Sequence, residues 1–234
     1  MTTERETDHA TDTASTWLED TRRSYDTVAD SYAERTRGLL DDMPVERAVM
    51  ETFADLVRTG GGGPVADVGC GPGRITAHLR GLGLDAFGID LSPAMIEVAR
   101  RDHPGVRFEV GSMTELDLAD ASVAGVVAWY SLIHVPDDEI GPVLAHFRRA
   151  MRPGAPLLLG FHVGDASQLK TEGYGGHPMK VHVHRRQPER LAAWLDEAGF
   201  TVETHRTLSS AESTLGGILL ATRRPDDRRG SLTG

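Results

Sequence analysis

The sequence predicts an α/β fold of the doubly wound type, built on one mostly parallel sheet of seven strands. Short apolar strands alternate with helical patterns between residues 64 and 162, which is typical of successive βαβ crossovers. A glycine-rich turn, "DVGCGPG" at residues 67–73, follows the first of these strands. Two closely spaced strands near the end of the chain predict an antiparallel hairpin at one edge of the sheet.

Length and composition predict one globular domain. The chain has 234 residues, of which 39% are hydrophobic and 26% charged. We expect a single domain over residues 17–224, with polar, mobile ends at 1–16 and 225–234. No apolar run approaches the roughly 20 residues of a membrane helix, and residues 1–16 lack the apolar segment of a secretory signal. The single cysteine excludes an intramolecular disulfide. These features predict a cytoplasmic protein with no membrane partner.

The charge balance argues against a nucleic-acid partner. The formal net charge is −10, whereas binding to phosphate backbones needs basic side chains gathered on one face. The basic doublets are instead spread along the chain, and we expect them to lie at the solvated ends of helices and strands. They are Arg22-Arg23, Arg100-Arg101, Arg148-Arg149, Arg185-Arg186 and Arg223-Arg224.

Two helices are predicted before the first strand. "TWLEDTRRSYDTVADSYAERTRG", residues 16–38, places aromatic and small residues at helical spacing, among them Trp17, Tyr25 and Tyr32. "PVERAVMETFADLVRTG", residues 44–60, begins with a proline and closes at a glycine run, as helices do. We expect these helices to form an N-terminal cap over residues 17–60.

The central part of the chain alternates strands and helices. The predicted strands span 64–68, 85–90, 106–110, 123–130 and 155–162, and the predicted helices span 73–82, 93–101 and 137–151. Such crossovers place helices on both faces of a mostly parallel sheet.

The last part of the chain departs from this pattern. "MKVHVHRR", residues 179–186, alternates like a strand, and "QPERLAAWLDEAGF", residues 187–200, is an amphipathic helix. The strands of the edge hairpin span 201–210 and 216–224. Because Gly173, Gly175 and Gly176 favour a mobile backbone, we expect residues 164–184 to form a lid over an acceptor molecule.

The glycine-rich turn lies where ligands bind in open α/β sheets, at the carboxyl end of the first strand. Gly69, Gly71 and Gly73 allow a tight turn and a close approach of the backbone to a ligand. The spacing is G-x-G-x-G, not the G-x-G-x-x-G of a dinucleotide site, and Asp67 precedes it. A carboxylate there repels a pyrophosphate and attracts a cation.

This turn resembles motif I of the class I, Rossmann-like S-adenosylmethionine-dependent methyltransferases, in their small-molecule branch. The resemblance implies S-adenosylmethionine as cofactor, with Asp67 and the three loop glycines around its methionine part. It continues in "GIDLSPAMIEVAR", where Asp90 lies 17 residues after Gly73, counting from 73 to 90. A carboxylate there can accept hydrogen bonds from both ribose hydroxyls.

Three further segments extend the resemblance over residues 65–161. "VRFEVGSMTELDL" is similar to the loop that frames the adenine, which implies roles for Ser112 and Met113; Leu91 and Met95 belong to the same predicted cofactor site. "VVAWYSLIHVPDDE" and "FRRAMRPGAPLLLGF" resemble the family's fourth and fifth strands with the helix between them. "YDTVADSYAERT" is similar to the N-terminal helix that covers the cofactor and the acceptor, which adds Tyr25 to the predicted cofactor site.

Acceptor-side candidates follow the fourth and fifth strands. His134 comes directly after the fourth strand and is a candidate general base for a hydroxyl acceptor; the alternative is a histidine that only caps the loop at Pro136. Tyr130, His162 and His177 are candidates for acceptor binding. Trp129 and Cys70 are expected to be packing residues, because Cys70 has no evident activating partner.

We do not predict a metal site. His182 and His184 share one strand face and lie near His177, which is compatible with metal binding. A divalent-metal methyltransferase would also gather carboxylates at the end of the fourth strand, and only Asp137 and Asp138 follow it, beyond a proline.

The sequence therefore predicts methyl transfer to a small molecule, with a hydroxyl of a natural product or other secondary metabolite favoured and nitrogen or carbon acceptors left open. The absence of the motif [N/D]-P-P-[Y/F] argues against methylation of nucleobases and glutamine. The alternative is a protein of this fold that binds the cofactor but catalyses a cyclisation or rearrangement, or serves as a non-catalytic partner. The chain is expected to be a monomer or a homodimer.

Overall fold

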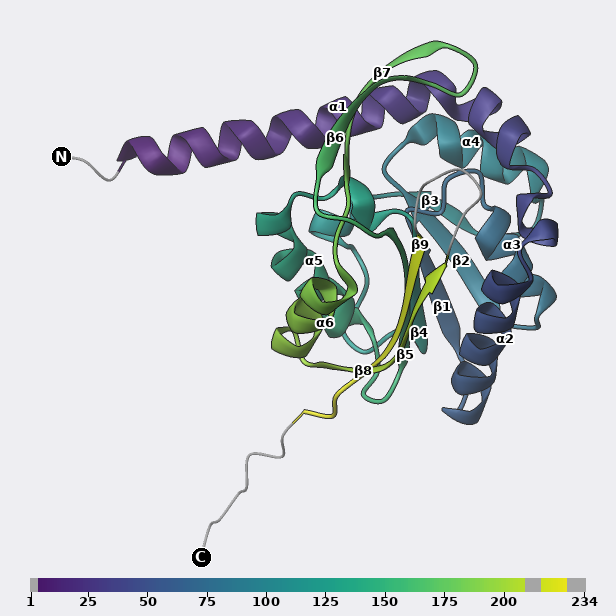
Figure 1. Ribbon diagram of the computed structural model, residues 1–234. Helices are drawn as coiled ribbons and strands as arrows, with labels where there is room; N and C mark the ends of the chain where they lie inside the picture. Colours follow the sequence, from purple (N-terminus) through teal and green to yellow (C-terminus); the bar gives the residue numbers. More distant parts are fainter. Residues whose placement is uncertain (1–3, 209–215, 227–234) are drawn as a thin grey trace, which may run out of the picture.

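A computed structural model describes residues 4–208 and 216–226 (Figure 1). Its main sheet has seven strands in the order β3-β2-β1-β4-β5-β9-β8, and β6 and β7 form a separate two-stranded sheet. The strands of the main sheet are β1 (Pro64–Val68), β2 (Asp85–Asp90), β3 (Phe108–Val110), β4 (Gly125–Trp129), β5 (Pro156–His162), β8 (Phe200–Leu208) and β9 (Gly216–Arg223). The five neighbouring strands β3, β2, β1, β4 and β5 pair in parallel, while β9 pairs antiparallel with both β5 and β8. The predicted fold class and edge hairpin are confirmed.

Helices cover both faces of this sheet. They are α1 (Glu4–Thr36), α2 (Pro44–Thr59), α3 (Arg74–Gly81), α4 (Pro93–Asp102), α5 (Asp137–Ala150) and α6 (Pro188–Glu197). Three 3-10 turns join them: η1 (Leu39–Asp42), η2 (Met113–Glu115) and η3 (Leu132–His134). Figure 1 shows α2 and α3 on one side of the sheet and α5 and α6 on the other.

Each face of the sheet has its own apolar core. On one face the fully buried Ile140, Leu144 and Phe147 of α5 pack on the strands together with Leu195 of α6. On the other, Met50 and Phe53 of α2 and Leu79 of α3 pack against Val65, Val127 and Leu158. Burial on both faces explains why the central strands are continuous apolar runs instead of alternating patterns.

The long helix α1 differs from its prediction at the N-terminal end. The predicted helix began near residue 16, after a mobile segment, whereas α1 begins at Glu4. Residues 4–16 contain neither proline nor glycine, so nothing in the backbone chemistry interrupts the helix. At the other end of the chain, most of the segment 225–234 lies outside the described residues.

The segment predicted as a lid contains a strand that the sequence reading missed. β6 (Ser167–Gly173) pairs antiparallel with β7 (His177–His184), and we call the two strands with their turn the 167–184 hairpin. The hairpin crosses α1 in Figure 1. Met179 and Val181 pack against Val28 and Ala29 of α1, and the Lys180 N–H donates to Ser24 Oγ at 2.8 Å. The hairpin is thus docked on α1, and its opening stays a prediction.

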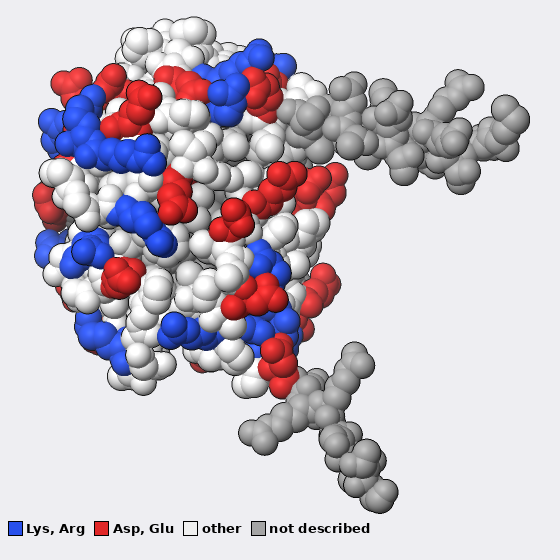
Figure 2. Space-filling view, turned by 180° about the vertical axis from the view of Figure 1, so that it is seen from behind, with Lys and Arg blue, Asp and Glu red and all other residues white. Residues whose placement is uncertain are grey.

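Two arginines of the basic doublets correct the expectation of surface charge. Arg186 is 3% exposed and Arg223 is 5% exposed, and both donate to backbone carbonyls of the core. Acidic and basic side chains are interspersed over the face shown in Figure 2. Among the described helices, none combines the length and apolar character needed to cross a bilayer.

Candidate ligand-binding site

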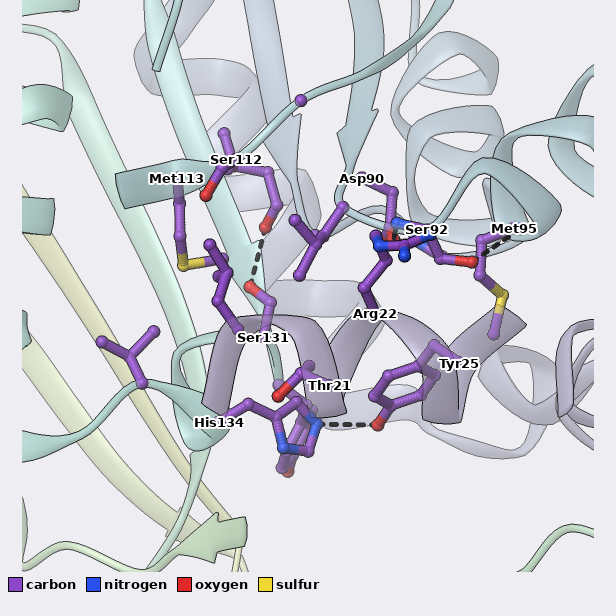
Figure 3. A pocket seen from close by; sticks show the side chains of 18 of the residues that line it. Thr21, Arg22, Tyr25, Asp90, Ser92, Met95, Ser112, Met113, Ser131 and His134 are labelled. Atoms are coloured by element: carbon purple, nitrogen blue, oxygen red, sulfur yellow. Dashed lines mark hydrogen bonds between the residues drawn. The ribbon is translucent and has the colours of Figure 1, made fainter. Parts of the chain in front are cut away.

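A cavity lies at the carboxyl ends of β1, β2 and β4, where the order of the strands reverses. The space between its lining residues, including the part that is open to solvent, is about 740 Å³. The strand ends form one side of the cavity, and α1 covers the opposite side (Figure 3). The lining residues are Trp17, Leu18, Thr21, Arg22, Tyr25, Tyr32, Val68, Gly69, Gly71, Asp90, Leu91, Ser92, Met95, Gly111, Ser112, Met113, Trp129, Tyr130, Ser131, His134 and Val135.

The glycine loop is packed so tightly that Gly69 admits no side chain. Its φ of 77° is left-handed, and a Cβ there would lie 2.2 Å from Ser131 Cβ. Ser131 in turn donates from Oγ to the Val68 carbonyl at 2.7 Å. This close approach joins the ends of β1 and β4 and leaves the pocket between them open.

Asp90 sits at the end of β2 and accepts two backbone hydrogen bonds. The Gly71 N–H donates to its Oδ2 at 2.7 Å, and the Ser92 N–H donates to its Oδ1 at 2.9 Å. Burial raises the pKa of Asp90 to about 6, although these two bonds oppose the shift. The Asp90 carboxyl group therefore lines the pocket, and no described side chain forms an ion pair with it.

Asp67 lies behind the loop instead of in the pocket wall. It is 1% exposed, and its Oδ2 accepts from the Thr76 hydroxyl at 2.6 Å. Its Oδ1 is buried and has no hydrogen-bond partner within the described part of the chain. Burial raises the pKa of Asp67 to about 7, so this carboxyl is poised to respond to a nearby positive charge.

His134 lies at the end of η3 and is held from two sides. Its Nδ1 lies 2.8 Å from the His182 carbonyl of β7, and its Nε2 lies 2.7 Å from the Tyr25 hydroxyl of α1 (Figure 3). A carbonyl only accepts, so Nδ1 carries the proton and Nε2 accepts from Tyr25. Burial lowers the pKa of His134 to about 4, which keeps the imidazole neutral.

The buried Arg186 fixes the turn that presents His134. Its guanidinium donates to the Leu132 carbonyl at 3.0 Å, to the Val135 carbonyl, and to Asp137 Oδ1 at 2.9 Å. These acceptors lie on both sides of His134 in the sequence. The prediction of a surface charge was wrong because the Arg186 guanidinium bonds three acceptors between η3 and the start of α5 in place of water.

The structure brings together most of the predicted cofactor and acceptor residues. Those that line the pocket are Tyr25, Gly69, Gly71, Asp90, Leu91, Met95, Ser112, Met113, Tyr130 and His134. Tyr130 does so with a left-handed φ of 56°, an uncommon conformation for a residue with a side chain. Trp129 is buried, as predicted, and also lines the pocket.

Four predicted site residues lie outside this lining. Asp67 is behind the loop, and Gly73 precedes α3 with its Cα facing Phe108. The His162 ring lies beside that of Tyr130, with centroids 5.0 Å apart and the planes tilted by 49°, and its buried Nδ1 has no described partner. His177 is exposed and lines a separate outer depression between α1 and α4.

Neither a metal centre nor a reactive thiol is apparent in the described residues. The His182 and His184 rings lie 6.0 Å apart, but no group of three potential ligands is gathered there or elsewhere in the described ranges. Cys70 packs with Ile96, Ala99 and Phe108, and burial raises the pKa of its thiol well above the usual value.

Most of the pocket residues that α1 contributes were not predicted from the sequence. Trp17, Thr21 and Tyr25 recur every four residues and therefore share one face of α1, as do Leu18 and Arg22. That spacing was visible in the sequence, but the apolar members read equally well as core residues. Arg22 is neutralised by Glu19 at 2.7 Å and Asp26 at 3.1 Å, so it adds no free cation to the pocket.

Comparisons with known proteins find similarity to methyltransferases. The family model "Methyltransferase domain" matches residues 65–154. An O-methyltransferase of Penicillium expansum, cnsE, is 32% identical over 160 residues, covering 60% of this chain and 57% of that protein. The ubiquinone biosynthesis O-methyltransferase of Xanthomonas euvesicatoria is 29% identical over 173 residues, covering 68% of this chain and 70% of that protein.

Solved structures share the fold. A Burkholderia thailandensis 1,6-didemethyltoxoflavin-N1-methyltransferase, with its acceptor and S-adenosylhomocysteine bound, has a TM-score of 0.58 at 24% identity, covering 82% of this chain and 87% of that one. The [4+2]-cyclase SpnF has a TM-score of 0.58 at 16% identity, covering 77% and 82%. At these identities the likeness concerns the fold alone.

Proposed function

Because the chain belongs to the class I S-adenosylmethionine-dependent methyltransferases, we propose that it methylates a hydroxyl oxygen of a small-molecule acceptor. The observation that carries the proposal is that one cavity holds both Asp90, which has no ion-pair partner among the described side chains, and the neutral His134 of η3. The Asp90 carboxylate can bind a cationic nucleoside, and the His134 imidazole can accept a hydroxyl proton. Both curated relatives described above are named as O-methyltransferases, which favours oxygen over nitrogen or carbon.

The pocket fits the cofactor on the evidence of its own chemistry. Asp67 Oδ1 is a buried carboxyl oxygen behind the loop with no hydrogen-bond partner among the described residues, and Asp90 adds a second carboxyl group at the wall. Arg22, the basic residue in the described lining, is already paired. A ligand with a positive charge would therefore relieve the cost of burying two carboxyl groups close together.

In this assignment the cofactor side is formed by Gly69, Gly71, Asp90, Leu91, Met95, Ser112 and Met113, with Asp67 acting from behind the loop. Asp90 would accept from the ribose hydroxyls, and Met95 would pack on the adenine. When bound, the cofactor supplies a methyl group on a positively charged sulfur, so the protein mainly aligns the acceptor and excludes water.

The acceptor side is formed by Tyr130 and His134, with His162 beside Tyr130. His134 would be the base that finally holds the proton of the hydroxyl, on the Nε2 atom that accepts from Tyr25 in this structure. His177 lies outside this group in the structure and is not assigned a role here.

Calorimetric titration with S-adenosylmethionine tests the cofactor side. We expect binding by the wild type and at least about tenfold weaker binding by Asp90→Ala, since a hydrogen bond to a charged group contributes roughly 1.5–3 kcal/mol. Asp85→Ala is the matched control, because Asp85 lies at the exposed start of the same strand and pairs with Arg80. No binding by the wild type would contradict the proposal.

A second function is kept open by the fold shared with the [4+2]-cyclase. A protein of this fold could bind the cofactor and use its charge to promote a cyclisation or rearrangement without transferring the methyl group. The two functions differ in turnover. Release of S-adenosylhomocysteine with a hydroxyl acceptor supports methyl transfer, and intact binding with no release for any acceptor supports the second function.

A further inference from the structure

We propose that Tyr25 is a catalytic residue that relays the acceptor proton to His134, so that the group touching the acceptor is the Tyr25 hydroxyl and not the imidazole. This inference rests on the proposed function, because it assumes a hydroxyl acceptor. It assigns to α1 a chemical role beyond covering the pocket.

The hydrogen bonds around His134 leave little choice of proton position. Nδ1 donates to the His182 carbonyl, which cannot donate, and this fixes the proton on Nδ1. Nε2 then has only a lone pair, and the Tyr25 hydroxyl at 2.7 Å must be its donor. The lone pair that a general base needs is therefore already engaged by Tyr25.

The hydroxyl of Tyr25 can accept as well as donate. Its single proton points to His134, and the Tyr174 hydroxyl also bonds it. An oxygen with two lone pairs keeps one for a donor in the pocket that Tyr25 lines. Its ring is held edge-on by His134 at 5.2 Å and by Tyr32 at 6.0 Å between centroids. Figure 3 shows the Tyr25 hydroxyl directed at the His134 imidazole.

The relay conserves protons and electrons. As the acceptor oxygen forms its bond to the methyl carbon of the sulfonium donor, the carbon–sulfur bond breaks and its electron pair stays on sulfur. The acceptor proton passes to the Tyr25 oxygen, and the Tyr25 proton passes to His134 Nε2. Tyr25 is neutral before and after, and His134 ends as an imidazolium whose positive charge replaces the sulfonium charge lost in the same step.

The groups around the pair favour a neutral resting imidazole. His162 of β5, His184 of β7 and Lys170 of β6 lie near His134 and oppose a positive charge on it. On the other side, Tyr25 has Asp90, Tyr32 and Tyr174 nearby, which disfavour a tyrosinate. A neutral hydroxyl donating to a neutral imidazole is the arrangement from which the relay starts.

The first test needs neither cofactor nor acceptor. In protein labelled with ¹⁵N-histidine, the His134 signals should show the Nδ1–H form, and Tyr25→Phe should shift the Nε2 resonance while leaving the tautomer unchanged. Thr27→Ala removes another hydroxyl from α1, on its exposed face, and should shift neither nitrogen. An Nε2 resonance that is the same in wild type and Tyr25→Phe overturns the proposal.

The second test follows turnover with a panel of simple phenols and alcohols, read as S-adenosylhomocysteine release. Tyr25→Phe and His134→Gln should each lower kcat by roughly 10²- to 10⁴-fold, the usual range for general acid–base catalysis, with cofactor affinity retained in a calorimetric titration. The double variant should be no slower than the slower single variant, because the two residues act as one unit. Thr27→Ala should keep the wild-type rate.

The outcomes separate the inference from the proposed function. Wild-type kcat in Tyr25→Phe, or fully multiplicative losses in the double variant, overturns the relay and leaves methyl transfer standing. No turnover by the wild type with any hydroxyl acceptor contradicts the proposed function and the relay with it. Loss of cofactor binding in a folded Tyr25→Phe variant assigns Tyr25 to the cofactor site and also overturns the relay.

Discussion

Replacing Gly69 by alanine tests the packing that creates the pocket. The added Cβ would lie 2.2 Å from Ser131 Cβ and 2.9 Å from Ser131 Oγ. Ser131 Cβ is attached to the backbone between β4 and η3, so rotating a side chain cannot relieve the first contact. Either the glycine loop or the turn that carries His134 has to move.

The expected cost has two parts. A left-handed backbone disfavours an L-residue by roughly 1–2 kcal/mol, and overpacking a tight site adds roughly 1–3 kcal/mol. Together they lower the free energy of unfolding by about 2–5 kcal/mol. For a domain of this size, about 2–4 °C of Tm is lost per kcal/mol, which gives a fall of roughly 4–20 °C.

Gly83→Ala separates the two parts. Gly83 also has a left-handed φ, 84°, but a Cβ there meets nothing within 4 Å. It should therefore show only the backbone cost, a fall in Tm of about 2–8 °C. Thermal unfolding followed by circular dichroism at one pH compares the variants. Adding Ser131→Gly to Gly69→Ala should recover part of the loss. A Gly69→Ala protein as stable as Gly83→Ala would refute the reasoning.

Two further predictions concern buried charges. The pKa of Asp67, about 7 in the folded protein, lies above its ordinary 3.8, so folding favours the protonated form and stability falls as pH rises from about 4 to 7 and then stays constant. Asp67→Asn keeps the size and an acceptor for Thr76. In urea unfolding it should raise the free energy of unfolding relative to wild type by about 3 kcal/mol more at pH 8 than at pH 4.5, and an effect independent of pH contradicts this. Arg186→Ala should lower the free energy of unfolding by about 3–5 kcal/mol, because it leaves buried acceptors near η3 without a donor. Arg190→Ala removes an exposed partner of the same Asp137 and should lower it by at most about 1 kcal/mol. Equal losses in urea unfolding would contradict the buried role of Arg186.

The sheet and the glycine loop were predictable because their signals are local. Apolar runs of strand length, separated by helical patterns, fix the order of the elements, and the bounds of β1 and β2 match the prediction residue for residue. Asp90 followed from its position at the end of such a run. A glycine-rich pattern likewise predicts the left-handed φ at Gly69 and Gly71.

What the sequence could not supply depends on contacts between distant segments. β6 has an almost entirely exposed, polar sequence, "SQLKTEG", which carries no apolar alternation and becomes a strand only by pairing with β7. Arg186 looks like half of a surface doublet until its acceptors, about fifty residues away, surround it. His134 and Tyr25 are 109 residues apart, and no local pattern indicates that they meet.

Helix α1 links the two halves of the site through neighbouring residues. Tyr25 bonds His134 on the acceptor side, while Asp26 accepts from the Ser92 hydroxyl at 2.6 Å and from the Ala94 N–H at 3.2 Å, beside the Asp90 turn. The hairpin joins the same helix through Ser24 and bonds His134 through the His182 carbonyl. A displacement of α1 that admits a ligand therefore breaks the Tyr25–His134 bond together with the contacts near Asp90. Under the proposed function, cofactor binding and the proton relay would therefore be coupled, because the neighbouring residues Tyr25 and Asp26 of α1 contact both sides of the site.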